Sequence, residues 1–403
     1  MKKLSMINQI LIAVILGIVF GLMFPKIAIN IKILGDIFLR LMQMTIPILV
    51  MGQIIQAVGS LKPKELTSMG LKTIAVFGVS SVLAAAFGIF MAWVLKPGNG
   101  IEITVKNSSA IKAQSVSLSD TILGFFTKNI FESLSTGNIV QIIIFSILFG
   151  LALSKIMASH PEYKILANII ELNEVIIKVI SYVMIIAPLG IFALISSTIS
   201  NLGIKIIIPL VKYLWVYGLA TLLFMILWII VISLYLKVSP VKLVLNMKEM
   251  SLMALATTSS AITLPIEMEE SRNKLGLTER ITNLVLPLGM SLNSNGSAMH
   301  MAITVMTIAQ LYNLDFNLQR MCYLAIMATF VSLANAVVPG AGLVSLAIIV
   351  PQMGLPVESI AIFAGVEWFV GMLRTILNVN SDVYSALIVA KSENEIDYTK
   401  FSA

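Results

Sequence analysis

The chain has 403 residues, of which 58% are hydrophobic and 12% are charged, and its mean hydropathy is +0.97. Soluble domains average roughly 45–50% apolar and about 25% charged residues, so a water-soluble fold is excluded. The net charge of +7 is explained by lysines in short loops on one side of a membrane, so no nucleic-acid partner is expected.

The apolar segments lack the period-two alternation of membrane β-strands, which predicts an all-α polytopic membrane protein. The first segment is too long for a signal peptide and has no small-residue cleavage site, so it is expected to span the bilayer. Spans are predicted at 7–25, 33–58, 71–95, 121–154, 165–200 and 204–236. The fourth and fifth exceed an ordinary span, so we expect tilts or breaks in them.

Lysines set the expected orientation, because cytoplasmic loops of membrane proteins are enriched in them. With the N-terminus in the cytoplasm, most lysine-bearing loops fall on that side. They contain Lys62, Lys64, Lys72, Lys155, Lys164, Lys237, Lys242 and Lys248. Lys26 and Lys32 lie outside and break the pattern. The predicted location is the cytoplasmic (plasma) membrane, with multiple passes and both termini in the cytoplasm.

Two interrupted segments follow the sixth span. The first, about 240–276, has apolar arms of about ten residues around a polar tip at 257–260. Ten helical residues rise about 15 Å, half of a ~30 Å hydrocarbon core, which predicts a re-entrant hairpin. The second, about 317–354, is broken by proline and glycine near 339–342 and is expected to enter from the opposite side. A polar helix follows each hairpin, and such inverted repeats surround the binding sites of secondary transporters.

The last helix, about 357–392, carries a polar face in a hydrophobic setting. That face contains Glu367, Gly371, Arg374, Asn378, Ser381, Asp382 and Ser385. An arginine inside a span costs several kcal/mol, which indicates a function and a partner. Its guanidinium suits bidentate capture of a carboxylate, and Gly371 leaves room beside it. The alternative is an internal network of Glu367, Arg374 and Asp382 that only fixes helix packing.

The helix after the first hairpin holds a second polar cluster. Its members are Asn293, Ser294, Asn295 and Ser297, around Gly296. Oxygens freed by a local unwinding could bind a hard cation or could join helices by hydrogen bonds. The presence of Asp382 in the last helix favours the cation site. Ser80 and Ser81 could belong to the same site, or could bond back to their own helix.

Four stretches between residues 240 and 393 occur in a characteristic order: TTSSAITLP, LPLGMSLNSNGSA, VPGAG, and RTILNVNSD followed by VAKSE. In these stretches the chain resembles the dicarboxylate/amino acid:cation symporter family, bacterial relatives of the glutamate transporters. The resemblance implies eight transmembrane helices, two oppositely oriented re-entrant hairpins, an elevator-type mechanism and a homotrimer. Residues 1–65 and 121–200 would form the scaffold and trimer contacts, and 66–97 and 201–403 the transport domain.

The same resemblance implies the binding residues. Those for substrate are Arg374, Asn378, Ser259, Ser260, Ser297, Gly371, Val338 and Gly342. Those for the cation are Asp382, Asn293, Asn378, Gly289, Asn295, Ser80, Ser81 and Ser332. The coupling ion would be Na⁺ or H⁺, with Na⁺ possible at Asp382, and no cofactor is expected. The tip of the second hairpin, 332–342, would act as the gate.

Several positions depart from the family pattern. The family's NMDGT motif reads Asn-Ser-Asn-Gly-Ser at 293–297, which loses the carboxylate and the thioether. Phe77 replaces a tyrosine, and Thr258 replaces the arginine of some members. Gly371 stands where amino-acid transporters of the family carry an aspartate for the substrate ammonium. We therefore expect fewer coupled sodium ions than in a sodium-driven glutamate transporter, or coupling to protons through Glu367 or Asp382.

The predicted function is cation-coupled symport of a small carboxylate solute, with a C4-dicarboxylate favoured because no side chain at Gly371 can pair an amine. The alternative within the family is an acidic or neutral amino acid symporter. An ion channel is the alternative from another class, and it differs because a channel cannot concentrate its solute.

An enzyme is disfavoured, since the sequence offers no His-based, Ser–Lys or paired-carboxylate constellation at a common depth. The two histidines, His160 and His300, are far apart, which gives no case for a metal site. The single cysteine, Cys322, cannot form an internal disulfide and is expected to be a small core residue.

Overall fold

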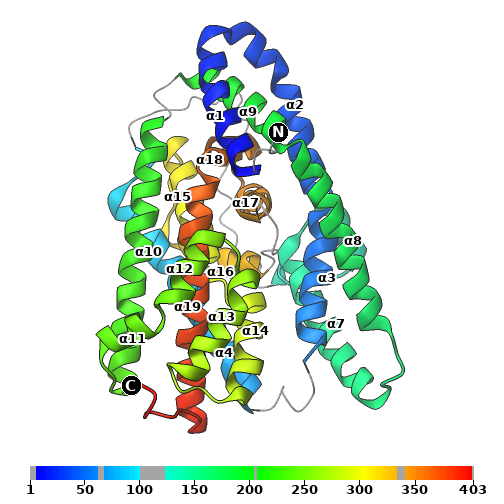
Figure 1. The fold of residues 1–403 in the computed structure, drawn as a ribbon. Coiled ribbons are helices and arrows are strands. Elements are labelled where there is room, and N and C mark those ends of the chain that lie inside the picture. The colour runs from blue at the N-terminus through cyan, green and yellow to red at the C-terminus, as the bar shows by residue number, and fades with distance from the viewer. Residues whose placement is uncertain (1–5, 62–67, 100–122, 204–206, 334–340, 402–403) are drawn as a thin grey trace, which may run out of the picture.

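The computed structural model describes residues 6–61, 68–99, 123–203, 207–333 and 341–401, and these residues form an all-helical fold (Figure 1). Their only β-type pairing is an isolated bridge between Leu277 and Ile396. Among the described residues, four helices are long and apolar enough to cross a membrane, or up to six if two bent pairs each count as one. The all-helical prediction is confirmed, and the eight spans with two hairpins remain a prediction.

Helices from the first half of the chain pack into one group, which lies along the top and right of Figure 1. They are α1 (Met6–Met23), α2 (Pro25–Gln43), α3 (Ile46–Gly59), α6 (Ile130–Thr136), α7 (Ile139–Ser159), α8 (Ile165–Ile185) and α9 (Ala187–Leu202). α9 lies against α1 and α2, and α3 lies against α7 and α8. We call these helices the first group.

The segment predicted as a span at 33–58 has different bounds in the structure. The helix already begins at Pro25, where a proline fits because the first turn needs no amide hydrogen. Only Met44 and Thr45 separate α2 from α3, both keep right-handed helical backbone angles, and α3 has Pro47 in its first turn. The predicted start at 33 is therefore wrong, whereas Pro25–Gly59 as a whole is long and apolar enough for one span.

Breaks do occur in the two segments that looked too long. Between α8 and α9 the axis bends by 53° just before Pro188, which has no amide to continue the helical hydrogen bonds. The segment predicted at 121–154 is divided at Gly137, whose φ of +69° suits glycine. Both expected breaks are confirmed.

The remaining helices surround α19 on the left of Figure 1 and form the second group. They are α4 (Ser68–Leu95), α10 (Ile207–Leu236), α11 (Pro240–Asn246), α12 (Lys248–Thr257), α13 (Ser260–Asn273), α14 (Glu279–Leu292), α15 (Asn295–Leu311), α16 (Leu318–Leu333) and α19 (Glu367–Glu393). Two short helices lie between the groups: α17 (Ala341–Gln352) contacts members of both, and α18 (Ile360–Ala364) contacts α9 and, through the ring of Phe363, Tyr213 of α10.

Two short helices meet at the polar tip predicted for the first hairpin. α12 ends at Thr257, and Thr258 adopts a left-handed φ of +52°. Ser259 then caps α13 by accepting the amide hydrogen of Ile262 at 3.4 Å. The two arms contact each other, and both contact α19. The predicted short arms and turn are therefore present.

The last polar helix begins later than predicted. α19 starts at Glu367, and the preceding helical piece is bent by 87° from it. The bend includes Gly365, where an added Cβ would lie 3.2 Å from Val14 of α1. Close packing favours glycine here, and glycine weakens a helix. The predicted start at 357 is therefore wrong.

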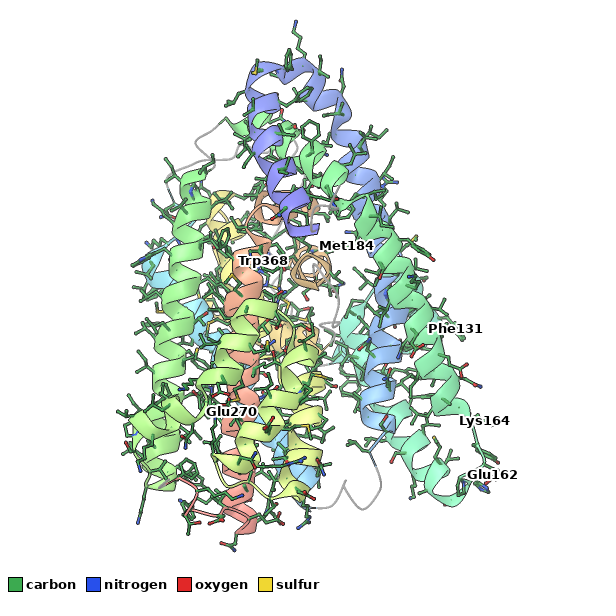
Figure 2. The ribbon with its side chains drawn as sticks, in the orientation of Figure 1. Phe131, Glu162, Lys164, Met184, Glu270 and Trp368 are labelled. Atoms are coloured by element: carbon green, nitrogen blue, oxygen red, sulfur yellow. The ribbon has the colours of Figure 1, made fainter. Side chains whose placement is uncertain are left out.

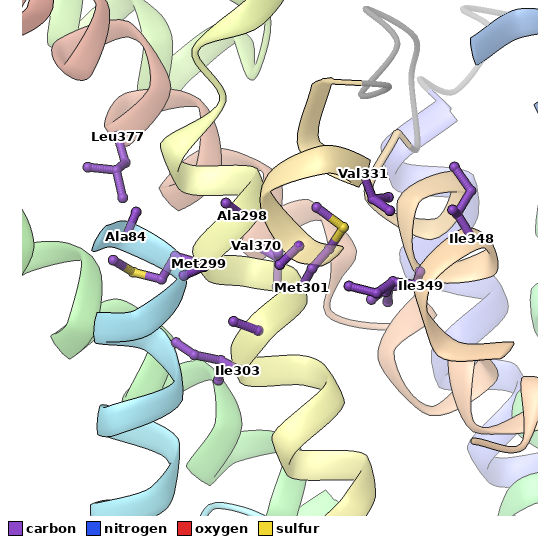
Figure 3. Packing of buried hydrophobic residues seen from close by; sticks show 14 of the residues in the cluster. Ala84, Ala298, Met299, Met301, Ile303, Val331, Ile348, Ile349, Val370 and Leu377 are labelled. Carbon is purple, nitrogen blue, oxygen red and sulfur yellow. The ribbon is translucent and has the colours of Figure 1, made fainter. Parts of the chain in front are cut away.

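Apolar packing holds the second group together. α4 lies along α15, with Ala84 facing the region of Met299 and Ile303 (Figure 3). A Cβ on Gly88 would lie only 3.0 Å from the side chain of Met299, so the two helices approach closely. This buried contact fixes the position of α15, whose first turn carries the polar cluster predicted at 293–297.

Many large apolar side chains point outward from the molecule (Figure 2). Leu83 on α4 and Leu234 on α10 are 55% and 74% exposed, as expected of surfaces that contact lipid. Cys322 is exposed as well, so its expected place in the core is wrong. The reason is its position on α16, where the buried face is formed by Leu324, Ala325 and Ala328.

Candidate functional site

Arg374 lies two turns after Glu367 on the same face of α19. Its Nη1 donates a hydrogen bond to Oε1 of Glu367 at 2.9 Å, and the two side chains are only 8% and 12% exposed. The buried guanidinium therefore has a charge partner in its own helix. Asp382, the third member considered for a packing network, bonds Asn293 instead.

Glu367 also connects α19 to the second arm of the second predicted hairpin. Its Oε1 accepts the amide hydrogen of Gly342 at 3.1 Å, at the start of α17. A helix N-terminus favours a negative charge. A Cβ on Gly342 would overlap both Arg374 and Glu367, so this close approach requires glycine. One carboxylate thus fixes the guanidinium and the hairpin arm together.

Gly371 leaves space on the other side of the guanidinium. A Cβ built there would lie 3.8 Å from Nη2 of Arg374 and 3.9 Å from the side chain of Thr258, at ordinary contact distances. Thr258 is the turn residue of the first hairpin, so the hairpin tip reaches α19 at this level. Nη1 of the guanidinium is held by Glu367, and Nη2 is the atom nearest to where a Cβ on Gly371 would lie. Nη2 can donate hydrogen bonds to a carboxylate.

One turn further along α19, Asn378 binds the break between α14 and α15. Its Oδ1 accepts the amide hydrogen of Gly296 at 2.7 Å, and its Nδ2 donates to Oγ of Ser297 at 3.5 Å. Tyr217 donates to the carbonyl of Gly296 at 3.1 Å. A Cβ on Gly296 would collide with the carbonyl of Arg374, so the backbones of α15 and α19 approach closely at this glycine.

Asp382 is fully buried where α14 and α19 meet. Its Oδ1 accepts a hydrogen bond from Nδ2 of Asn293 at 2.9 Å, and its Oδ2 has no hydrogen-bond partner within the described part of the chain. A Cβ on Gly289 would lie 2.7 Å from its carboxyl carbon. Asn293 ends α14, and α15 begins at Asn295, so the predicted unwinding is present. The bare oxygen is available to a cation.

Ser80 and Ser81 of α4 join the same region. Oγ of Ser80 lies 3.0 Å from Oδ1 of Asn293, 3.1 Å from Oδ1 of Asn295 and 2.9 Å from the carbonyl of Phe77. Ser81 donates to Asn295 at 2.9 Å. The bond of Ser80 back to its own helix is thus present, and its place in a cation site stays a prediction. The Ser80 hydroxyl has one hydrogen and can donate to only one of these three oxygens at a time. The serines and asparagines of this cluster are all uncharged.

A family comparison bears on this arrangement. The sequence model of the sodium:dicarboxylate symporter family matches residues 6–392 of this chain. The chain belongs to this family. Its members are cation-coupled symporters rather than enzymes, so the resemblance and the class of function predicted from the sequence are confirmed. The chain is accordingly a multi-pass membrane protein.

Similar members of the symporter family carry more than one name. The chain is 33% identical to the proton/sodium-glutamate symport protein of Bacillus caldotenax, over 99% of this chain and 97% of the relative. It is 32% identical to the proton/glutamate-aspartate symporter of Escherichia coli, over 99% and 95%. It is also 28% identical to C4-dicarboxylate transport protein 1 of Ralstonia nicotianae, over 98% and 94%. Sequence identity therefore does not distinguish between these substrates, and the choice between them must be argued from the residues of the site.

Other predicted site residues of this symporter are placed as follows. Ser260 is the first residue of α13 and is partly buried. Ser332 is buried and bonds the carbonyl of Thr329 at 2.7 Å, within α16. Val338 lies outside the described residues. The contacts of the described residues thus join Gly342, Gly371 and Thr258 around Arg374, while this hydrogen bond of Ser332 stays inside its own helix.

Sequence reasoning missed one buried carboxylate, Glu267 on α13. A polar stripe could have revealed it, because Ser259, Thr263, Glu267 and Ser271 follow one another at four-residue spacing, on one face of a helix. Within the described residues there is no group of three or more His, Cys, Asp or Glu side chains that could hold a metal ion.

Proposed function

We propose that this chain imports a small carboxylate solute by secondary active symport with Na⁺ or H⁺, and that a C4-dicarboxylate is the favoured substrate. The observation that carries the proposal is the buried guanidinium of Arg374. Glu367 pairs with it through Nη1, and Nη2 lies next to Gly371, which has no side chain and which approaches Thr258 of the first hairpin tip. A planar carboxylate in the space that Gly371 leaves can accept charge-assisted hydrogen bonds, which are stronger than neutral ones.

The preference for a dicarboxylate over an amino acid rests on what surrounds that space. An ammonium taken out of water needs a negative partner, and leaving it unpaired costs several kcal/mol. Gly371 offers no side chain, and Oε1 of Glu367 already accepts from Arg374 and Gly342. The nearby first-hairpin tip offers hydroxyl and amide groups, which suit a second carboxylate. The acidic or neutral amino acid symporter remains the alternative.

The packing of the helices supports separate scaffold and transport domains. The second group holds Arg374, Asp382 and the polar break after α14, whereas the first group packs mainly within itself. We propose that the first group is the scaffold of a homotrimer and that the second group moves as an elevator-type transport domain. The proposal includes eight transmembrane helices, two re-entrant hairpins and cytoplasmic termini, as the lysine distribution favours.

The function is tested by uptake of labelled succinate into proteoliposomes under separately imposed sodium and proton gradients. We expect succinate to accumulate above its external concentration. We also expect a shallow sodium dependence, because Asn295 is neutral and its oxygen already accepts hydrogen bonds from two serines.

Two results would contradict this proposal in different ways. Succinate that only equilibrates across the membrane would indicate a channel. A steep sodium dependence, with a Hill slope near that of three bound ions, would show that a sodium ion still binds near Asn295 although the 293–297 segment has no carboxylate. Collapse of the gradients with ionophores serves as the control, since it should abolish accumulation without affecting binding.

A further inference from the structure

Glu267 is a buried carboxylate without a partner. It is 0% exposed, and neither of its oxygens has a hydrogen-bond partner among the described residues. The adjacent acidic residues differ from it. Glu269 is exposed, and Glu270 (labelled in Figure 2) accepts from the amide of Met250 at 2.8 Å and from Lys274 at 2.7 Å. A carboxylate buried without partners must either be protonated or be matched by a ligand or a counter-charge.

The carboxylate of Glu267 interacts electrostatically with that of Asp382. The two come from α13 and α19, which pack against each other, and α14 contacts both helices. Asp382 contributes the unpartnered Oδ2. Ser271, one turn after Glu267 on the same face of α13, is also fully buried with an unpartnered hydroxyl. Two helices that pack against each other therefore both carry buried oxygens without a hydrogen-bond partner among the described residues.

The region contains too little positive charge for two carboxylates. Arg374 lies eight residues before Asp382, about 12 Å along α19, and is paired with Glu367. Two like charges in a buried site repel strongly, and an opposite charge between them relieves the repulsion. Carboxylate and hydroxyl oxygens are the ligands that hard cations prefer. A bound cation would satisfy both the charge and the orphaned oxygens.

We propose that Glu267 is a ligand of the coupling cation and holds a sodium ion jointly with Asp382 between α13 and α19. The inference rests on the proposed function in that this sodium ion drives uptake. Glu267 supplies a carboxylate to the ion-binding region, in which the 293–297 segment has none. It also links the ion to the first hairpin, because α13 is the second arm of that hairpin. Sodium binding therefore positions the hairpin tip beside Arg374.

The test is a sodium titration of the thermal unfolding midpoint of the purified protein, with choline chloride keeping the ionic strength constant. Sodium should raise the midpoint of the wild type, because a ligand of the folded state stabilises it. Glu267→Gln should raise the half-saturating sodium concentration by roughly tenfold or more, since even indirect ligand partners contribute that much. Glu269→Gln, two residues away and exposed, should titrate as the wild type does.

A double variant tests whether the ion is shared. If one sodium ion is held by both carboxylates, the losses of sodium affinity in Glu267→Gln and Asp382→Asn should not add, so the double variant should lose less than the sum of the two single variants. If Glu267→Gln does not fold, Glu267→Asp keeps the charge on a shorter side chain and should still weaken sodium binding. The proposal would be overturned if a folded Glu267 variant had the same half-saturating sodium concentration as the wild type. It would also be overturned if sodium did not raise the unfolding midpoint of the wild type.

These experiments can refute the sodium-ligand proposal and the proposed function independently of each other. Concentrative succinate uptake together with an unchanged sodium affinity in Glu267→Gln would refute the sodium ligand and leave the proposed function intact. Sodium binding that depends on Glu267, in a protein that does not accumulate succinate, would refute the function instead.

Discussion

Replacing Arg374 by cysteine is expected to abolish uptake of dicarboxylates. The substitution removes the donors at Nη2 that face the space beside Gly371. Truncating one partner of a buried charged hydrogen-bonded pair costs about 2–5 kcal/mol, which corresponds to roughly a 30-fold or greater loss of affinity. The measurement is the concentration dependence of labelled succinate uptake into proteoliposomes, with variant and wild type reconstituted in equal amounts.

The control for this variant must separate binding from folding, because Arg374→Cys also leaves Glu367 without its cation. Breaking a buried pair from one side is destabilising, whereas removing both charges is often tolerated. We therefore expect the double variant Arg374→Cys with Glu367→Gln to recover thermal stability but not uptake. Wild-type affinity for succinate in either variant would show that Arg374 does not bind the substrate.

Introducing an aspartate at Gly371 is expected to shift the preference from dicarboxylates to acidic amino acids. The position accepts a side chain, because an added Cβ meets its nearest neighbours at 3.8 Å or more. The new carboxylate would pair a substrate ammonium and would repel a second substrate carboxylate. Hydrogen bonds to charged groups contribute about 1.5–3 kcal/mol, so L-aspartate should inhibit succinate uptake roughly 10- to 100-fold better than in the wild type.

The matched control is Gly371→Asn, which has nearly the same shape as the aspartate variant without its charge. It should leave the ratio of the succinate and L-aspartate inhibition constants close to that of the wild type. If both variants change the ratio equally, the effect is steric. The absence of an acidic side chain at Gly371 would then not be the basis of the dicarboxylate preference.

Local sequence features predicted the elements that carry the site. The turn at Thr258, the cap at Ser259 and the break at Asn293 follow from residue types that end or begin helices, so they were visible in the sequence. The pairing of Glu367 with Arg374 follows from their spacing on one helix face. Helix bounds near Pro25 and Gly365 were predicted less well, because long apolar runs give no periodic signal at their ends.

Contacts between distant helices were beyond the sequence argument. Glu267 stands in the run IEMEE, within the first predicted hairpin, and its burial depends on how α13 packs against α19. The sharing of Ser80 between Asn293, Asn295 and its own helix likewise depends on the position of α4. Such contacts require the tertiary structure, because residues about 210 positions apart meet there.

The central claim is that the site binds a second carboxylate in preference to an amine, and competition for labelled succinate uptake tests it most directly. The wild-type protein in proteoliposomes is given a fixed cation gradient, and unlabelled succinate and L-aspartate are titrated as inhibitors. The arrangement of Arg374, Gly371 and Thr258 predicts tighter inhibition by succinate. Tighter inhibition by L-aspartate would contradict the dicarboxylate assignment and make this member of the family an amino acid symporter.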